Sequence, residues 1–90
     1  MLILERTNRF KKDVKLMVKR GKSLDKLKII TTKLVNQEPL PARHRDHVLM
    51  GNYNHARECH IEPDWLLIYR CTETELQLAR TGTHADLFKR

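Results

Sequence analysis

The segment that decides the fold is Trp65-Leu66-Leu67-Ile68-Tyr69, in which every residue is apolar. A strand that is apolar at every position is covered on both faces, as in the centre of a sheet. Turn-forming residues bound the segment, since Pro63-Asp64 precedes it and residues 72–75 follow it. The segment is also far shorter than the roughly 20 apolar residues that cross a bilayer. We therefore predict a buried central strand and no membrane span.

Similar short runs lie on both sides of this segment and predict further strands. Turn-forming pairs such as Gly51-Asn52 separate them, and such short connections join antiparallel neighbours. With the central segment included, the expected strands are Val48 to Met50, Tyr53 to Glu62, Trp65 to Cys71 and Leu76 to Thr81. The preceding stretch, Gln37 to Arg45, contains Pro39 and Pro41, which disfavour helix, so we expect an extended linker there.

The first half of the chain predicts a short strand followed by two helices. Residues 2–4 are apolar, and Thr7 next to Asn8 can cap a helix whose first amide groups need acceptors. Gly21 is suited to end this helix, because glycine adopts the left-handed conformation without steric cost, and Ser23 can begin the next. Apolar residues recur every three or four positions: Phe10, Val14, Met17 and Val18, then Leu24, Leu27, Ile30 and Leu34. The short connection predicts a hairpin of two helices packed on the sheet.

Together these elements predict an α+β fold, in which a small antiparallel β-sheet packs against an N-terminal two-helix hairpin in the order β-α-α-β-β-β-β. The 90 residues suffice for one domain, residues 1–90, and so small a core leaves an active site on an open face or in a shallow groove. Met1-Leu2-Ile3-Leu4 is too short for a signal-peptide core, so we expect a cytoplasmic protein. Cys59 and Cys71 are then expected as reduced thiols.

The charge of the chain indicates an anionic partner. The formal net charge is +7, and residues 1–45 contain 13 Lys and Arg against four acidic residues. Residues 46–90 contain four of the five histidines. A basic excess is typical of proteins that bind nucleic acid, although any single lysine is explained as well by a solvated helix face. The sequence is thus basic in its first half and rich in titratable side chains in its second.

Side chains that can transfer a proton near neutral pH gather in the second half of the chain. They are His44, His47, His55, His60 and His84, with the carboxylates Glu58, Glu62 and Asp64. Cleavage of RNA without a metal needs a base for the ribose 2′-hydroxyl, an acid for the departing 5′-oxygen and a cation for the phosphorane, and Arg80 could be that cation. Because side chains alternate along a strand, Glu58, His60 and Glu62 are expected on one face. A half-exposed strand without a role shows the same alternation, so this pattern alone does not decide.

A metal site is the rival use of these histidines and of the two cysteines. Cys59 and His60, however, are adjacent in a predicted strand and point in opposite directions, so they do not readily share one ion. The sequence also contains no Cys-x-x-Cys pair, and we expect neither a metal nor a cofactor. Trp65 and Phe88 are candidates for stacking on RNA bases, although a Trp at the head of an apolar strand is more often part of a core.

Three segments resemble the signature of the YafQ toxins, which belong to the RelE/ParE superfamily of bacterial toxin–antitoxin modules. They are Asp46-His47, Cys59 to Tyr69 and Arg80 to Phe88. The most specific parts are His-x-Glu-Pro-Asp-Trp at residues 60–65 and Arg-Thr-Gly-Thr-His at residues 80–84. The resemblance runs over essentially the whole chain and implies an antiparallel sheet backed by two helices, in agreement with the order of elements above.

The resemblance implies an endoribonuclease, an mRNA interferase that enters the ribosomal A site and cleaves messenger RNA there. Carried over by position, it assigns catalysis to His47, His60, Asp64, Arg80 and His84, and RNA base contact to Trp65 and Phe88. We expect His84 as the general acid and Arg80 beside the scissile phosphate. His47, His60 and Asp64 remain alternatives for the base or its orienting partner.

The same resemblance names the partners and one rival function. The 70S ribosome, its mRNA and a cognate antitoxin are the expected partners, with basic side chains of the helices against ribosomal RNA. A ParE-like toxin that binds DNA gyrase without cleaving nucleic acid is the alternative, and the presence of His47, His60 and His84 argues against it. A plain nucleic-acid-binding module is a third possibility. His44 and His55 lie outside the matched positions and are expected to be exposed.

Overall fold

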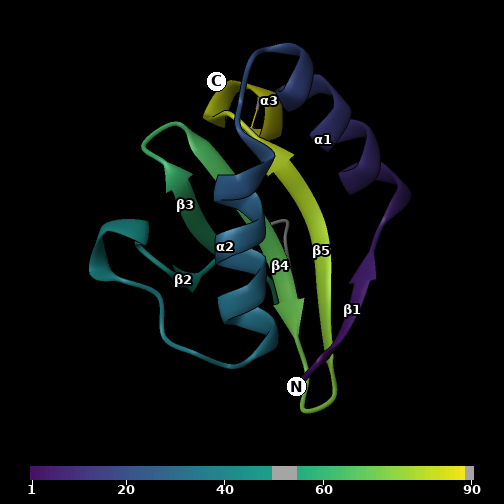
Figure 1. Cartoon of the computed structure of the whole chain (residues 1–90), viewed down its shortest axis with the longest axis vertical. Helices are drawn as coiled ribbons and strands as arrows, with labels where there is room; N and C mark the ends of the chain where they lie inside the picture. The colour runs from purple at the N-terminus through teal and green to yellow at the C-terminus, as the bar shows by residue number, and fades with distance from the viewer. Residues whose placement is uncertain (50–54, 89–90) are drawn as a thin grey trace.

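The computed structural model describes residues 1–49 and 55–88, which form one β-sheet with helices on both faces (Figure 1). The helices are α1 (Asn8–Lys19), α2 (Leu24–Val35), the short 3-10 helix η1 (Ala42–His44) and α3 (His84–Phe88). The strands are β1 (Ile3–Arg6), β2 (His47–Val48), β3 (Arg57–Glu62), β4 (Trp65–Cys71) and β5 (Glu75–Gly82). The predicted α+β class is confirmed. The predicted strand ends at Met50 and Tyr53 lie outside the described residues.

The sheet has the strand order β1-β5-β4-β3-β2, with β4 in the centre. β4 pairs antiparallel with β3 and β5, and β2 pairs antiparallel with β3, so the predicted series of antiparallel strands is confirmed. β1 differs, because it pairs parallel with β5, beginning with Ile3 opposite Glu75. The sheet is therefore mixed, which corrects the wholly antiparallel prediction. Parallel neighbours need a long crossover, and the helical hairpin provides it here together with the other strands.

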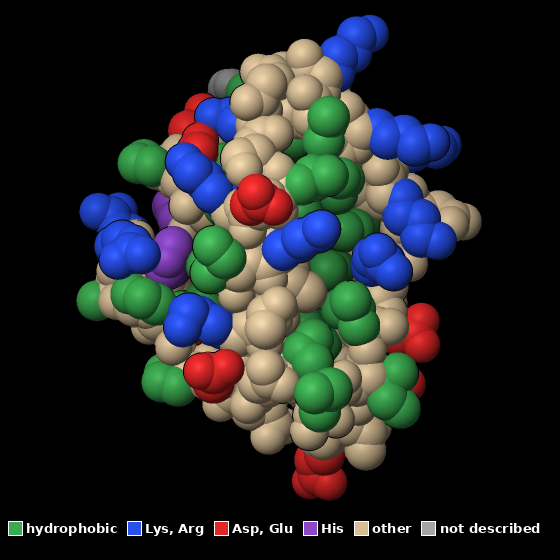
Figure 2. Space-filling model, in the orientation of Figure 1, with side chains coloured by type: hydrophobic (Ala, Val, Ile, Leu, Met, Phe, Trp, Pro, Cys, Tyr) green, Lys and Arg blue, Asp and Glu red, His purple; other side chains and the backbone are tan. Residues whose placement is uncertain are grey.

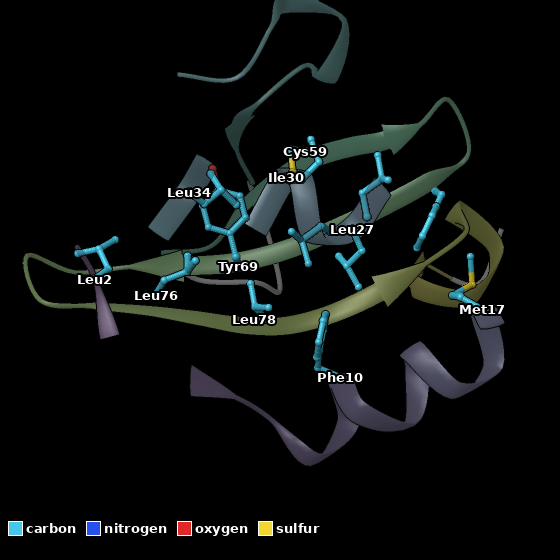
Figure 3. Packing of buried hydrophobic residues seen from close by; sticks show 13 residues of the cluster. Leu2, Phe10, Met17, Leu27, Ile30, Leu34, Cys59, Tyr69, Leu76 and Leu78 are labelled. Carbon is cyan, nitrogen blue, oxygen red and sulfur yellow. The ribbon is translucent and has the colours of Figure 1, made fainter. Parts of the chain in front are cut away.

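The helical hairpin packs on one face of the sheet, where the larger core cluster lies (Figure 3). Thr7 caps α1 as predicted, because its Oγ1 accepts the backbone N–H of Phe10 at 3.0 Å. Gly21 follows α1 with a φ of 89°, the left-handed conformation that was expected there. The buried residues of the cluster are Leu2, Phe10, Met17, Leu27, Ile30, Leu34, Cys59, Ile61, Trp65, Leu67, Tyr69, Leu76 and Leu78.

The opposite face of the sheet carries a second, smaller core cluster. Its buried residues are Ala56, Leu66, Ile68, Ala79 and Leu87. Leu87 comes from α3, which the sequence analysis did not predict because a helix of five residues is too short to show a hydrophobic period. Since Leu66 and Ile68 face one cluster and Leu67 faces the other, the predicted central strand is indeed covered on both faces.

A register shift in β3 changes the predicted direction of one carboxylate. The shift lies between His60 and Glu62, where the pairing with β4 is irregular. Such a bulge interrupts the alternation of side chains along a strand. Lys22 and Lys26, from the hairpin side of the sheet, donate to the carboxylate of Glu62 at 2.6 and 2.7 Å. Glu62 therefore does not share a face with His60, contrary to the prediction.

A second shift lies in β5, where Arg80 pairs with Ile68 and Leu78 with Tyr69, so that Ala79 is passed over. The predicted extended linker also needs correction, because residues 42–44 within it form η1. Its 3-10 turn is closed by the backbone N–H groups of His44 and Arg45, which donate to carbonyl groups three residues earlier. Among the described residues, no helix is long and apolar enough to span a membrane.

Candidate active site

Three histidines from three different elements meet on the sheet face that lies away from α1 and α2. His47 belongs to β2, His60 to β3 and His84 to the start of α3. The ring centroid of His60 is 6.5 Å from that of His47 and 5.8 Å from that of His84. His60 alternates with Cys59 and Ile61, which face the hairpin core, and it therefore points to the other side. The structure thus brings together the three histidines that the sequence analysis selected.

The carboxylate of Glu58 lies between two of these rings. Its Oε2 is 3.1 Å from Nε2 of His47 and 3.6 Å from Nε2 of His60, and the Glu58 side chain is only 8% exposed. Strand parity placed Glu58 on the face of His60, and these distances confirm it. Glu58 was nevertheless not among the predicted catalytic residues, because the family resemblance did not assign it a role.

The hydrogen bonds of His60 determine which of its nitrogens can act as a base. Nδ1 lies 3.3 Å from the carbonyl oxygen of Pro63. Because a carbonyl only accepts, Nδ1 carries the proton in this contact, and Nε2 presents a lone pair when the ring is neutral. Nε2 is separated from Glu58 by 3.6 Å, which is longer than a hydrogen bond. The geometry therefore leaves Nε2 as the atom of His60 that can accept a proton.

His47 is fixed through the two residues that precede it. Arg45 has a left-handed backbone with a φ of 46°, and its carbonyl oxygen is 2.5 Å from Nδ1 of His47. Oδ1 of Asp46 accepts the hydroxyl of Tyr69 at 2.5 Å and Nε of Arg57 at 3.2 Å. Burial and the hydrogen bond to Asp46 raise the pKa of Tyr69, so its hydroxyl stays a donor. A core tyrosine of β4 thereby anchors the segment that presents His47.

Asp64 and His84 form a closely hydrogen-bonded pair at the rim of the site. Oδ1 of Asp64 is 2.5 Å from Nδ1 of His84 and also accepts the backbone N–H of His84 at 3.0 Å. The backbone hydrogen bond, followed by the side-chain bond, holds the pKa of Asp64 below its ordinary value. Since Nδ1 is engaged by a carboxylate, Nε2 is the ring nitrogen of His84 that can deliver a proton to a substrate.

His44 and His55 were both expected to be exposed, and the structure confirms this for His55 but not for His44. His55 is exposed in a turn. His44 is buried, with 9% of its surface exposed, and its Nδ1 lies 2.6 Å from the carbonyl oxygen of His60. It packs in η1 against β3, so it supports the backbone of the strand that carries His60. Its position in the predicted linker gave no signal of this burial.

The sequence matches one family model over residues 2–89, described as a bacterial toxin of type II toxin–antitoxin systems, YafQ. The chain belongs to the YafQ family. It is 49% identical over 86 residues to the mRNA interferase toxin YafQ of Escherichia coli strain K12, and the match covers 94% of both chains. This family match favours the predicted YafQ resemblance over the ParE alternative.

Solved structures of YafQ proteins have the same fold. The crystal structure of YafQ from E. coli BL21(DE3) is 46% identical and superimposes with a TM-score of 0.92, covering 98% of this chain and 99% of that one. YafQ in the crystal structure of the E. coli DinJ–YafQ toxin–antitoxin complex is 48% identical with a TM-score of 0.90, covering 97% of each chain. The fold described above is therefore the YafQ fold.

Arg80, the expected phosphate contact, is held by an acidic residue of α1. Its Nε and Nη2 donate to the carboxylate of Asp13 at 2.7 and 3.3 Å, and the backbone N–H of Thr81 donates to the same group at 3.2 Å. The shift that passes over Ala79 places Arg80 opposite Ile68. These bonds tie Arg80 to α1. Its role at the phosphate stays a prediction.

Trp65 and Phe88, the two expected base contacts, differ in their surroundings. Trp65 is 1% exposed within the hairpin core, and its Nε1 donates to Oγ1 of Thr81 at 2.8 Å. A base cannot stack on a side chain enclosed in this way, so the structure assigns Trp65 to the core and contradicts the expectation for it. Phe88, in α3, is only partly buried against the second cluster. It stays a candidate for base contact.

The cysteines lie apart from this chemistry. Both are free, with Cys59 buried and Cys71 exposed. Burial raises the pKa of Cys59 to about 12, so its thiol stays protonated and unreactive. Among residues 1–49 and 55–88, no group of three or more His, Cys, Asp or Glu side chains is arranged to hold a metal ion.

Proposed function

We propose that this chain, acting as a single domain, is a ribosome-dependent endoribonuclease of the cytoplasm that cleaves mRNA in the ribosomal A site and is neutralised by a cognate antitoxin. The observation that carries the proposal is the cluster of three histidines on one sheet face, with a carboxylate beside each ring. Paired imidazoles and carboxylates supply both halves of acid–base cleavage of RNA. The name mRNA interferase of the 49% identical E. coli relative supports the same activity.

The hydrogen bonds of the site suggest a division of roles. His60 acts as the base, because its Nε2 can take the proton of the ribose 2′-hydroxyl while Glu58 stabilises the imidazolium that forms. The 2′-oxygen then attacks phosphorus, and the bond to the 5′-oxygen breaks as His84 protonates it from Nε2. Asp64 orients His84, and His47 completes the cluster by holding Glu58. The products are a cyclic phosphate and a 5′-hydroxyl end.

The ribosome is a physically reasonable partner for so basic a molecule. Lys and Arg side chains are spread over the face that α1 and α2 present (Figure 2). Because such contacts release counterions from RNA, ribosome binding should weaken steeply as salt rises. The active site itself lies on the other face, where it is free to meet the messenger while basic side chains meet ribosomal RNA.

We expect cleavage of mRNA only when it is bound to ribosomes. The purified chain would be incubated with translating ribosomes and, in parallel, with the same mRNA alone, and the new ends would be mapped. Cuts in register with the A-site codon are the expected result. Cuts in naked mRNA alone would refute the ribosome dependence, and the absence of cuts in both mixtures would refute the nuclease activity.

A groove on the hairpin face fits an antitoxin segment. It has a volume of about 470 Å³ and lies where α1, α2, β1 and β5 meet. Its apolar floor includes Leu4, Val14, Leu24 and Leu27, and its rim includes Arg6, Lys11, Lys15 and Lys28. Figure 2 shows this apolar strip with basic side chains beside it. Within the described part of the chain, no acidic residue lines the groove.

This combination of floor and rim selects one kind of occupant, an acidic amphipathic helix. Its apolar side chains would cover the floor, and its carboxylates would meet the basic rim. An antitoxin that binds here would also cover basic side chains proposed to meet ribosomal RNA, which explains neutralisation without blocking the histidines. The E. coli complex of YafQ with DinJ provides the probe for a test.

Replacing Leu24 with aspartate should weaken binding of purified E. coli DinJ by at least about tenfold, because it places a carboxylate on the apolar floor. The matched control is Ile29→Asp, since Ile29 is also an exposed apolar residue of α2 but does not line the groove. Calorimetric titration of the two variants and the parent chain measures the difference. Equal losses for both variants, or no binding by the parent chain, would contradict the proposed docking site.

A further inference from the structure

We propose that an ion pair between Arg20 and Asp86 is a positioning device for His84, which it holds against Asp64 by fixing the first turn of α3. The expected effect on the cleavage rate rests on the function proposed above, whereas the positioning of His84 does not. The two residues are 66 positions apart in the sequence, one at the C-terminal end of α1 and the other within α3. Neither belongs to the site described above.

The carboxylate of Asp86 makes two kinds of contact at once. Nη1 and Nη2 of Arg20 donate to its Oδ2 and Oδ1 at 2.5 and 3.1 Å, which is a bidentate pair. The backbone N–H of Thr83 also donates to Oδ2, at 3.0 Å, while Oγ1 of Thr83 accepts the backbone N–H of Asp86 at 3.1 Å. These reciprocal bonds form a capping box around the first turn of α3. Asp86 therefore links the cap of α3 to the end of α1.

Gly82 makes room for this arrangement. A Cβ at residue 82 would lie 3.0 Å from Cβ of Asp86 and 3.1 Å from its Oδ2. Both distances are shorter than ordinary contacts, so any larger residue would push the carboxylate out of its place. The close approach of the backbone at the end of β5 is thus part of the same device.

The capping box determines where His84 points, because His84 is the first residue of α3. Its backbone N–H and its ring Nδ1 both reach Oδ1 of Asp64. A helix of five residues does not persist on its own, since so few intrahelical bonds do not offset the cost of nucleation. Leu87 packs the end of α3 against the second core cluster, whereas the first turn is held by its cap and by Arg20. The bidentate pair holds the pKa of Asp86 at about 2, so this ion pair between Arg20 and Asp86, the clamp, stays charged at neutral pH.

The main test is Asp86→Ala, measured through the pKa of Asp64 by carboxyl NMR and through the maximal cleavage rate on saturating ribosomes. If the clamp positions His84, its loss frees the backbone N–H that lowers the pKa of Asp64, and that pKa rises toward its ordinary value. Removal of the negative charge of Asp86 alone would lower it instead. The sign of the change thus separates positioning from simple electrostatics.

We also expect the maximal rate to fall by about 10- to 100-fold in Asp86→Ala, with little change in the ribosome concentration that gives half the rate. Arg20→Gln should also lower the maximal rate. Arg20→Lys should lower it less than Arg20→Gln does, because lysine keeps the positive charge but not the bidentate geometry. Lys19→Gln, which removes a neighbouring exposed charge of α1, is the control for the pKa of Asp64.

An unchanged or lower pKa of Asp64 in Asp86→Ala would overturn the proposal, as would a full cleavage rate in both Asp86→Ala and Arg20→Gln. If the parent chain cleaves no mRNA, the proposed function fails. The NMR measurement still decides whether the ion pair positions His84, so the two failures are distinguishable.

Discussion

Replacing His84 with alanine should lower the maximal cleavage rate by about 10²- to 10⁴-fold, the usual contribution of one proton-transfer group. His84 is the proposed acid, with Nδ1 held by Asp64 and Nε2 directed to the departing 5′-oxygen. The measurement is single-turnover cleavage of ribosome-bound mRNA at saturating protein. His55→Ala is the matched control, because His55 is exposed in a turn outside the site, and we expect it to cleave at the parent rate.

The pH dependence gives this prediction a second readout. The parent chain should show a bell-shaped profile, because the base must be unprotonated and the acid protonated. Without His84 the acid is gone, so the fall in rate on the alkaline side should disappear while the fall on the acidic side stays. Cleavage by His84→Ala at nearly the parent rate, or an unchanged bell-shaped profile, would show that His84 is not the acid.

Much of the fold could be predicted because its signals are local. The apolar run at residues 65–69 fixed the central strand, and Thr7 and Gly21 fixed the ends of α1. The parallel pairing of β1 with β5 has no local signal, because these strands are the first and the last in the chain and meet only when the whole domain has folded. α3 was missed for a related reason, because a cap, an ion pair and the burial of the single residue Leu87 hold it, and none of these produces a periodic apolar face.

The candidate site was predicted in part, and the failures have physical causes. The three histidines do meet, but strand parity assigned Glu62 to the face of His60, and a bulge turned it toward Lys22 and Lys26. Glu58, which parity treated in the same way, reaches the site because it lies before the bulge. A single inserted residue thus separates two carboxylates that the sequence pattern makes equivalent.

Trp65 shows how a residue next to the site can be taken for part of it. It directly follows Asp64, yet its side chain enters the hairpin core while the carboxylate of Asp64 faces His84. Its indole N–H donates to Thr81, whose hydroxyl donates in turn to the carbonyl oxygen of Leu66 at 2.6 Å. A buried indole with a satisfied N–H stabilises the fold and leaves no face for an RNA base.

Replacing Trp65 with alanine should therefore lower the free energy of unfolding by about 3–5 kcal/mol, the cost of a large aromatic cavity. Domains are typically stable by only about 5–15 kcal/mol, so this variant should be partly unfolded in mild urea. Trp65→Phe keeps most of the packing and loses one hydrogen bond, and we expect it to cleave near the parent rate per folded molecule. Urea denaturation combined with the cleavage assay measures both quantities. A stable Trp65→Phe protein with a 100-fold loss of cleavage would instead place Trp65 against the RNA, because packing alone cannot produce that combination.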